Sequence, residues 1–331
     1  VTARVWLAII GLVVYVSLYA RPALSFLEAV FHEADAYGPG EVFVPSRRAR
    51  GELAVWVSFV PFMSVDLRAN VDTRVFATDA SSRSCAAVAT ELPEELVREL
   101  WRQRPRRGVL QKFAGDASAR EPDPNVDEKQ CFSWSDGLDA DEATSCGFQA
   151  GALVADLCES VGWAPVFQYS VRRFEHIVTK EARPICTLVR RLADEVRPGG
   201  SRVLNFADSS TNVGAWAKGR SSSRRLAWLL RQVAPDQLLT DLQVGIPHVP
   251  TQANPADAPT RGKPVRRAPL RSERSDLVDA LMSGRFDART DAAFAASSRS
   301  EALPADVLEP AKGPPYDFAF QPVGLRRGDE N

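Results

Sequence analysis

RVLNFADSS, residues 202–210, is an apolar stretch that ends in a carboxylate. It is typical of a buried strand that carries Asp208 at its end, and AKGRSSS at 217–223 follows it with cations and hydroxyls ahead of a helix at 222–233. A carboxylate at the end of a hydrophobic strand is costly to bury unless another group pairs with it. We therefore look for partners of Asp208 elsewhere in the chain.

Three further acids are placed where a fold could bring them to Asp208. Asp79 ends a strand at 74–79 that forms a hairpin with 85–90, and Asp257 falls in the first turn of a helix opened by Asn254-Pro255. Glu181 opens a helix that we expect to begin near Lys180, because proline at 184 fits only a first turn. Further strands are predicted at 167–171 and 242–246. The pattern predicts an α/β fold, a mixed five-stranded sheet with flanking helices.

Four carboxylates at one place would repel each other unless cations bind among them. Mg²⁺ is the natural occupant, because it is a hard ion held by a few carboxylates and substrate phosphate. Two such ions could activate a water and stabilise the leaving oxygen of a phosphodiester. Any one acid alone is more often a helix cap, a surface charge or an ion-pair partner, and Asp66, Asp72 and Glu175 are rivals with equal claims by spacing.

Five blocks of the sequence resemble the RNase H domain of retrotransposon reverse transcriptases, especially those of DIRS-like elements. The blocks are ATDAS at 77–81, HIVTKEA at 176–182, ADS at 207–209, KGRSSS at 218–223, and VP at 249–250 with NPADAPTR at 254–261. The resemblance implies an RNase H-like hydrolase, an endonuclease that cuts the RNA strand of RNA–DNA hybrids with two Mg²⁺ ions, which Mn²⁺ could replace. It assigns catalysis and metal binding to four positions: Asp79, Glu181, Asp208 and Asp257.

The chain departs from that family in two ways. An insertion at 93–162 separates the hairpin from the third strand, and its part at 116–142 is expected to be a partly disordered loop. Where some relatives carry a histidine after the fifth strand, this chain has Thr251-Gln252, and His248 is expected to be structural.

The block at 218–223 is the candidate contact with nucleic acid. Its cations and hydroxyls precede a helix, an arrangement that suits phosphate, although serine capping and solvated cations are the simpler interpretation. The predicted nucleic-acid-binding residues are Lys218, Arg220, Ser221, Ser222, Arg224 and Arg225. Trp216 and Trp228 are expected in the core. Recognition of RNA would come from 2′-hydroxyl contacts, so cleavage should be nearly independent of sequence.

Three regions are expected along the chain. Residues 1–70 resemble the helical thumb or connection of those polyproteins, 71–262 are expected to form the RNase H-like domain, and 263–331 are expected to be a linker and a disordered tail. The apolar run at 5–20 has 16 residues, short of the roughly 20 that span a bilayer, so a core helix is favoured over a membrane anchor. The polymerase signature Tyr-x-Asp-Asp is absent, and the first residue, Val1, suggests a fragment or a processed product.

Composition leaves several functions open. The net charge of −1 indicates that nucleic-acid binding must come from local patches, and five cysteines without a CxxC pair favour a reduced intracellular setting, cytoplasmic or nuclear. The expected partners are an RNA–DNA hybrid and the polymerase part of the same polyprotein, with no membrane. The alternative is a catalytically inactive or domesticated fragment that only binds nucleic acid or a protein.

Overall fold

The computed structural model describes residues 1–34, 36–38, 40–102, 104–105, 154–171, 175–195, 200–267 and 276–284. All of them belong to one compact unit, Val1–Glu301. Most of the predicted insertion and most of the predicted tail, including the loop expected at 116–142, lie outside the described residues. The three-region division stays a prediction.

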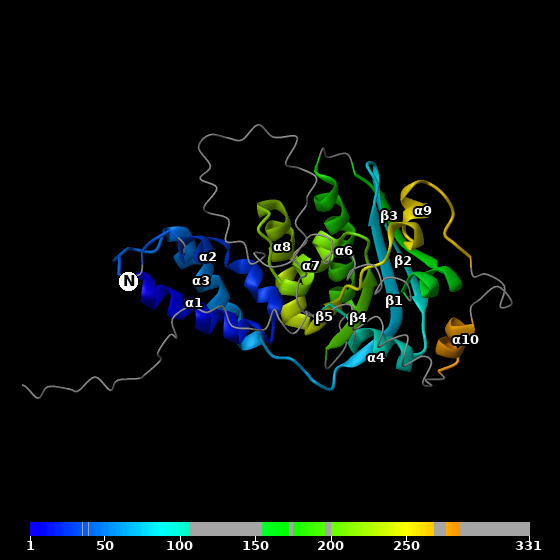
Figure 1. The fold of residues 1–331 in the computed structure, drawn as a ribbon, viewed down its shortest axis with the longest axis horizontal. Coiled ribbons are helices and arrows are strands. Elements are labelled where there is room, and N and C mark those ends of the chain that lie inside the picture. The colour runs from blue at the N-terminus through cyan, green and yellow to red at the C-terminus, as the bar shows by residue number, and fades with distance from the viewer. Residues whose placement is uncertain are drawn as a thin grey trace, which may run out of the picture. The chain divides into compact units, whose positions relative to one another are not determined.

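A five-stranded mixed sheet forms the centre of the fold (Figure 1). Its strands are β1 (Asn70–Ala80), β2 (Ser84–Glu91), β3 (Ala164–Ser170), β4 (Ser201–Phe206) and β5 (Leu242–Gly245), in the order β3-β2-β1-β4-β5. The β1–β2 and β2–β3 pairs are antiparallel, whereas β1–β4 and β4–β5 are parallel. The predicted α/β fold with flanking helices is confirmed, and it is consistent with an RNase H-like architecture.

Each face of the sheet carries its own hydrophobic core. One core joins the sheet to α6 (Ile177–Asp194), α7 (Ser210–Lys218) and α8 (Arg224–Thr240). The other joins it to α4 (Glu94–Arg102), to the helical residues 154–160 and to α10 (Asp276–Met282). Figure 1 shows α6, α7 and α8 on one side of the sheet and the short helix α9 (Asp257–Thr260) on the other. Both faces therefore carry packed helices, whereas the edge strand β3 is largely exposed.

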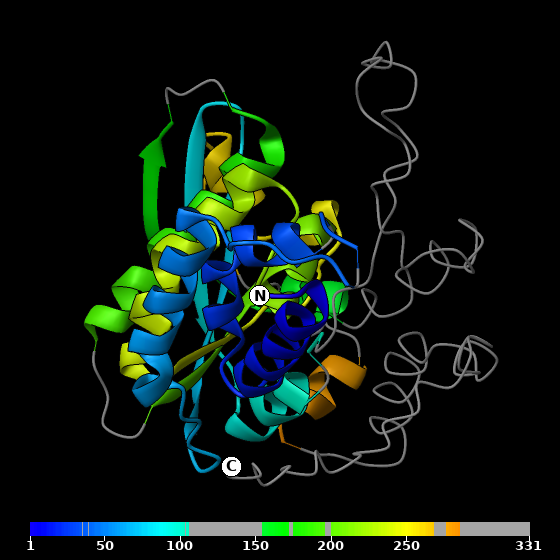
Figure 2. The same cartoon turned by 90° about the vertical axis from the view of Figure 1, so that its left-hand side faces the viewer.

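The N-terminal helices form a third core. They are α1 (Ala3–Ser17), η1 (Arg21–Phe26), α2 (Glu28–Ala34), α3 (Arg47–Phe59) and η2 (Val60–Phe62). This core includes Ala234 and Leu238 of α8, so the N-terminal helices pack on α8, as Figure 2 shows from the side.

The apolar run at 5–20 lies mainly in α1, which buries only one stripe. Trp6, Ile10 and Val13 are buried, whereas Leu12 and Tyr15 are 64% and 62% exposed. The segment is therefore a helix that contributes one face to the core and leaves its other face exposed. Among the described helices, none has the length and apolar character needed to cross a bilayer.

The predicted start of α6 near Lys180 is wrong. The helix begins at Ile177, where His176 Nδ1 accepts the Val178 N–H at 3.4 Å, and Pro184 lies in the interior. Proline has no N–H for the carbonyl four residues earlier. That carbonyl belongs to Lys180, and the Cys85 thiol on β2 contacts it at 3.8 Å. A tertiary donor thus replaces the missing helical one, which the local proline rule does not anticipate.

Candidate active site

The parallel pairing of β1 with β4 places Asp79 and Asp208 at the same end of the sheet. Ala77 pairs with Phe206, so each acid lies two residues beyond a matched pair. Asp79 is 6% exposed and accepts a hydrogen bond from Thr260 Oγ1 at 2.8 Å. Burial raises the pKa of Asp79 to about 6, and the negative charges of Asp208 and Asp257 add to the rise against the Thr260 bond. The expected neighbourhood of these two acids is present.

Asp208 lies in the connection between β4 and α7, which is hydrogen-bonded to the chain that follows β5. The Ala207 N–H donates to the Pro247 carbonyl at 3.3 Å, and His248 Nε2 lies 3.2 Å from the Asp208 carbonyl oxygen. Burial raises the pKa of the Asp208 carboxyl, while a hydrogen bond from Thr251 opposes the rise. Burial lowers the pKa of His248, whose backbone contact agrees with the structural role expected for it.

Glu181 approaches the same two acids from α6. Burial raises the pKa of its carboxyl, a hydrogen bond with Ser209 opposes this, and the charges of Asp208 and Asp79 raise it further. The side chain therefore lies within electrostatic range of both strand-end acids. The helix start at Ile177 places Glu181 one turn into α6.

Asp257 is a partly exposed member of the four acids. It begins α9, its side chain is 30% exposed, and it pairs with Arg261 at 2.8 Å. Its charge contributes to the raised pKa of Asp79. Asp79 interacts electrostatically with each of the other three acids. The charges of Asp208 and Asp257 raise its pKa, and its own charge raises the pKa of Glu181.

Carboxylates are suitable ligands for Mg²⁺, but these carboxylates are not arranged closely enough to enclose an ion. Carboxylate oxygens are hard ligands, and Mg²⁺ commonly takes few of them beside water and substrate phosphate. Within the described ranges, no three or more His, Cys, Asp or Glu side chains are arranged so that they could hold a metal ion by themselves. Any ion here would need further ligands, such as water or substrate phosphate, beside the carboxylates.

The 218–223 block forms the connection between α7 and α8. Gly219 ends α7 in the left-handed region at φ 70°, where an added Cβ would lie 2.0 Å from the Arg21 carbonyl oxygen. Burial lowers the pKa of the Lys218 ammonium, and the charge of Arg220 lowers it further. The Arg220 guanidinium lies 4.7 Å from the centre of the Phe31 ring. Part of the predicted phosphate-binding block therefore packs against the N-terminal helices.

The start of α8 is more exposed than the block before it. Arg224 and Arg225 are exposed, and Arg224 Nε lies 3.8 Å from Glu28 Oε1 of α2. Trp228 is 49% exposed, so its expected place in the core is wrong, whereas Trp216 is buried as expected. Trp228 lies outside the apolar stripe of α8, which leaves its ring on the solvent side of the helix.

Several polar residues that contact the carboxylates or their strands were not predicted from the sequence as part of the site. Thr260 bonds to Asp79, and Asn254 Nδ2 donates to the Thr78 carbonyl on β1 at 3.3 Å. Thr251 contacts the Asp208 carboxyl. Thr260 could have been predicted as a neighbour of the site, because it follows Asp257 by three residues and helical spacing places the two on the same side of a turn.

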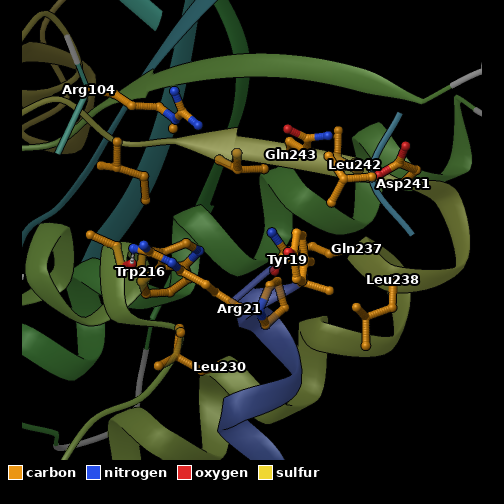
Figure 3. A pocket seen from close by; sticks show the side chains of 18 of the residues that line it. Tyr19, Arg21, Arg104, Trp216, Leu230, Gln237, Leu238, Asp241, Leu242 and Gln243 are labelled. Carbon is orange, nitrogen blue, oxygen red and sulfur yellow. Dashed lines mark hydrogen bonds between the residues drawn. The ribbon is translucent and has the colours of Figure 1, made fainter. Parts of the chain in front are cut away.

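A cavity of 260 Å³ lies at the free edge of the sheet, among β5, the end of α8 and the chain around Arg21 (Figure 3). The indole Nε1 of Trp216 and the amide Nε2 of Gln243 are buried there without a partner in the described part of the chain. None of the four predicted acids lines this cavity, and its one acidic lining residue is Asp241. The cavity is therefore separate from the carboxylate group.

Comparisons with known proteins do not establish a family for this chain. No family model matches the sequence, and no curated protein matches it. Among solved structures, the chain is similar to the foamy viral protease-reverse transcriptase in complex with RNA/DNA hybrid, at a TM-score of 0.20 and 10% sequence identity. The match covers 86% of this chain and 48% of that chain, so this chain spans about half of its length. A likeness at this level does not assign a function.

Proposed function

We propose that this chain is an RNase H-type endoribonuclease that hydrolyses the RNA strand of RNA–DNA hybrids as part of a retroelement reverse transcriptase. The observation that carries the proposal is the group of acids at one end of the sheet. Burial raises the pKa values of Asp79, Glu181 and Asp208, and neighbouring carboxylate charges raise those of Asp79 and Glu181 further. Strongly perturbed, interacting acids are more common at functional sites than elsewhere on proteins.

Asp79, Glu181, Asp208 and Asp257 are the residues that would hold Mg²⁺. When bound, the ions supply an activated water and charge stabilisation at the leaving oxygen. The protein itself contributes fixed carboxylates: the Thr260 hydroxyl holds Asp79, and the backbone bonds around Ala207 hold the turn of Asp208. A preorganised set of ligands of this kind needs no protein nucleophile.

Of the predicted nucleic-acid-binding residues, those at the start of α8 are exposed and could contact a nucleic acid. Arg225 and Ser222 are exposed, and a helix N-terminus with cations nearby suits a phosphate backbone. Contacts of this kind position a duplex without reading its sequence. The proposed substrate is accordingly a hybrid of any sequence.

The test is hydrolysis of a labelled RNA–DNA hybrid in Mg²⁺ by the wild-type protein and by the Asp208→Asn variant. We expect cleavage of the RNA strand by the wild type only, with double-stranded DNA of the same sequence left intact. Asn keeps the shape of the side chain and removes its charge, so folding should be preserved, as circular dichroism would check. Equal cleavage by the two proteins would remove Asp208 from the mechanism.

A second candidate function is binding without catalysis. The open arrangement of the acids, the Asp257–Arg261 pair and the packing of Arg220 on Phe31 favour it. A fragment of this kind would bind the hybrid equally well in EDTA and in Mg²⁺. Hybrid binding that is insensitive to EDTA, with no cleavage in Mg²⁺ or Mn²⁺, would decide in its favour.

A further inference from the structure

The helix α9 is four residues long, and its position depends on donors from other elements. A single helical turn is not stable by itself in water. Gln168 Nε2 of β3 donates to the Pro259 carbonyl at 2.7 Å. The hydroxyls of Ser81 and Ser84, at the turn between β1 and β2, both donate to the Thr260 carbonyl. The sheet therefore fixes the helix that begins with Asp257.

The side chain of Thr260 connects this helix to Asp79. Thr260 is 5% exposed, and its Oγ1 lies 2.8 Å from Asp79 Oδ2 and 2.8 Å from the Asp257 carbonyl oxygen. A hydroxyl has one proton, so it donates to one of these oxygens at a time. The ionised carboxylate is the stronger acceptor, since charge-assisted hydrogen bonds are shorter and stronger than neutral ones.

We infer that Thr260 is a positioning residue: its hydroxyl orients the Asp79 carboxylate and ties it to the helix that carries Asp257. The inference rests on the proposed function, because it treats both acids as metal ligands. Groups that orient a ligand through one hydrogen bond typically change metal affinity by roughly 10- to 100-fold when removed. Thr260 meets that description through geometry alone: burial, a fixed backbone and a short bond to one ligand.

The test measures Mn²⁺ binding by the substrate-free protein, from the loss of the electron paramagnetic resonance signal of free Mn²⁺. Thr260→Val removes the hydroxyl and keeps the side-chain shape and the backbone carbonyl that anchors α9. We expect roughly 10-fold weaker Mn²⁺ binding for this variant. Thr260→Ser restores the hydroxyl and should bind within twofold of wild type. Thr260→Ala removes the same group and replaces the valine variant if that protein does not fold.

Ser84→Ala is the matched control. It removes one bond to the Thr260 carbonyl and leaves the bond between Thr260 and Asp79 in place. We expect a lower unfolding midpoint with nearly unchanged Mn²⁺ affinity, which separates the anchoring of α9 from the orientation of Asp79.

The outcomes distinguish this inference from the proposed function. Wild-type affinity in the valine variant, or equal weakening in the valine and serine variants, overturns the positioning role of Thr260 alone. A wild-type protein that binds Mn²⁺ without cutting hybrid overturns the nuclease and keeps the positioning role. A wild-type protein that binds no Mn²⁺ overturns the metal site and the inference with it.

Discussion

The raised pKa of the buried Asp79 carboxyl predicts how the stability of the protein depends on pH. Its pKa in the folded protein is about 6, against the ordinary value of 3.8. Burial is the main cause, followed by repulsion from Asp208. A carboxyl whose pKa is raised by folding stabilises the folded state while it is protonated. This contribution is fully present below the unfolded pKa and is lost as pH rises through the folded pKa.

The Asp79→Asn variant should therefore be more stable than the wild type in EDTA at pH 7. A shift of about two pKa units at 1.36 kcal/mol each corresponds to roughly 3 kcal/mol at neutral pH, as an upper estimate. Because the wild-type carboxyl becomes protonated below pH 6, the difference should fall to about half that value at pH 5. The asparagine side chain still offers an oxygen to Thr260.

The measurement is urea denaturation of both proteins at pH 5 and pH 7 in EDTA, repeated with about 10 mM Mg²⁺ in place of EDTA. Mg²⁺ should stabilise the wild type and have little effect on Asp79→Asn, since a ligand that binds only the folded state raises its stability. Glu91→Gln, at an exposed acid on β2, is the control and should change neither quantity. If Asp79→Asn is no more stable than wild type at pH 7, the account of its burial is wrong. If Mg²⁺ stabilises both proteins equally, Asp79 is not a ligand.

Two predictions concern the N-terminal helices. Glu52 is 8% exposed and accepts the backbone N–H groups of Ala29 and Val30 at the start of α2, at 2.6 and 3.2 Å. Glu52→Ala should lower the free energy of unfolding in urea by about 2 kcal/mol, and Glu52→Gln by less, because it keeps an acceptor. Gly219→Ala should lower the melting temperature measured by calorimetry, because its Cβ would lie 2.0 Å from the Arg21 carbonyl oxygen at a φ of 70°; an unchanged temperature would mean that this contact is loose.

The sequence predicts those parts of the fold in which local pattern and tertiary packing agree. Alternation and apolar runs identify the strands, and the apolar stretch before Asp208 is the buried strand β4. The position of Trp228 could also have been predicted. Buried α8 residues recur at 226, 229, 230 and 233, and residue 228 falls on the opposite side of that helical stripe.

The start of α6 and the contacts of Thr260 could not be predicted in this way. A proline interior to a helix is disfavoured by local rules, and only the register of β2 places Cys85 near the Lys180 carbonyl, to which Pro184 offers no N–H. Likewise, the bond from Thr260 to Asp79 joins residues that are 181 positions apart, so it depends on how α9 docks on the sheet. Long-range hydrogen bonds follow from strand order and register, which residue spacing does not encode.

The Asp257–Arg261 pair provides an independent test of whether this group of acids binds an ion. Arg261 is exposed and donates to Asp257 Oδ1 through both Nε and the terminal nitrogen, at 2.8 Å each. An ion that uses Asp257 must compete with this guanidinium. Removing the competitor in Arg261→Gln should therefore tighten Mn²⁺ binding, by roughly two- to five-fold given the small strength of exposed ion pairs.

The control for this change is Arg98→Gln, which breaks an exposed pair with Glu94 on α4, a helix that carries none of the four acids, and should leave Mn²⁺ affinity unchanged. Weaker binding in Arg261→Gln would mean that the arginine supports the site instead of competing for it. Unchanged binding would place Asp257 outside the metal site. The candidate ligands would then be Asp79, Glu181 and Asp208, which lie within electrostatic range of one another.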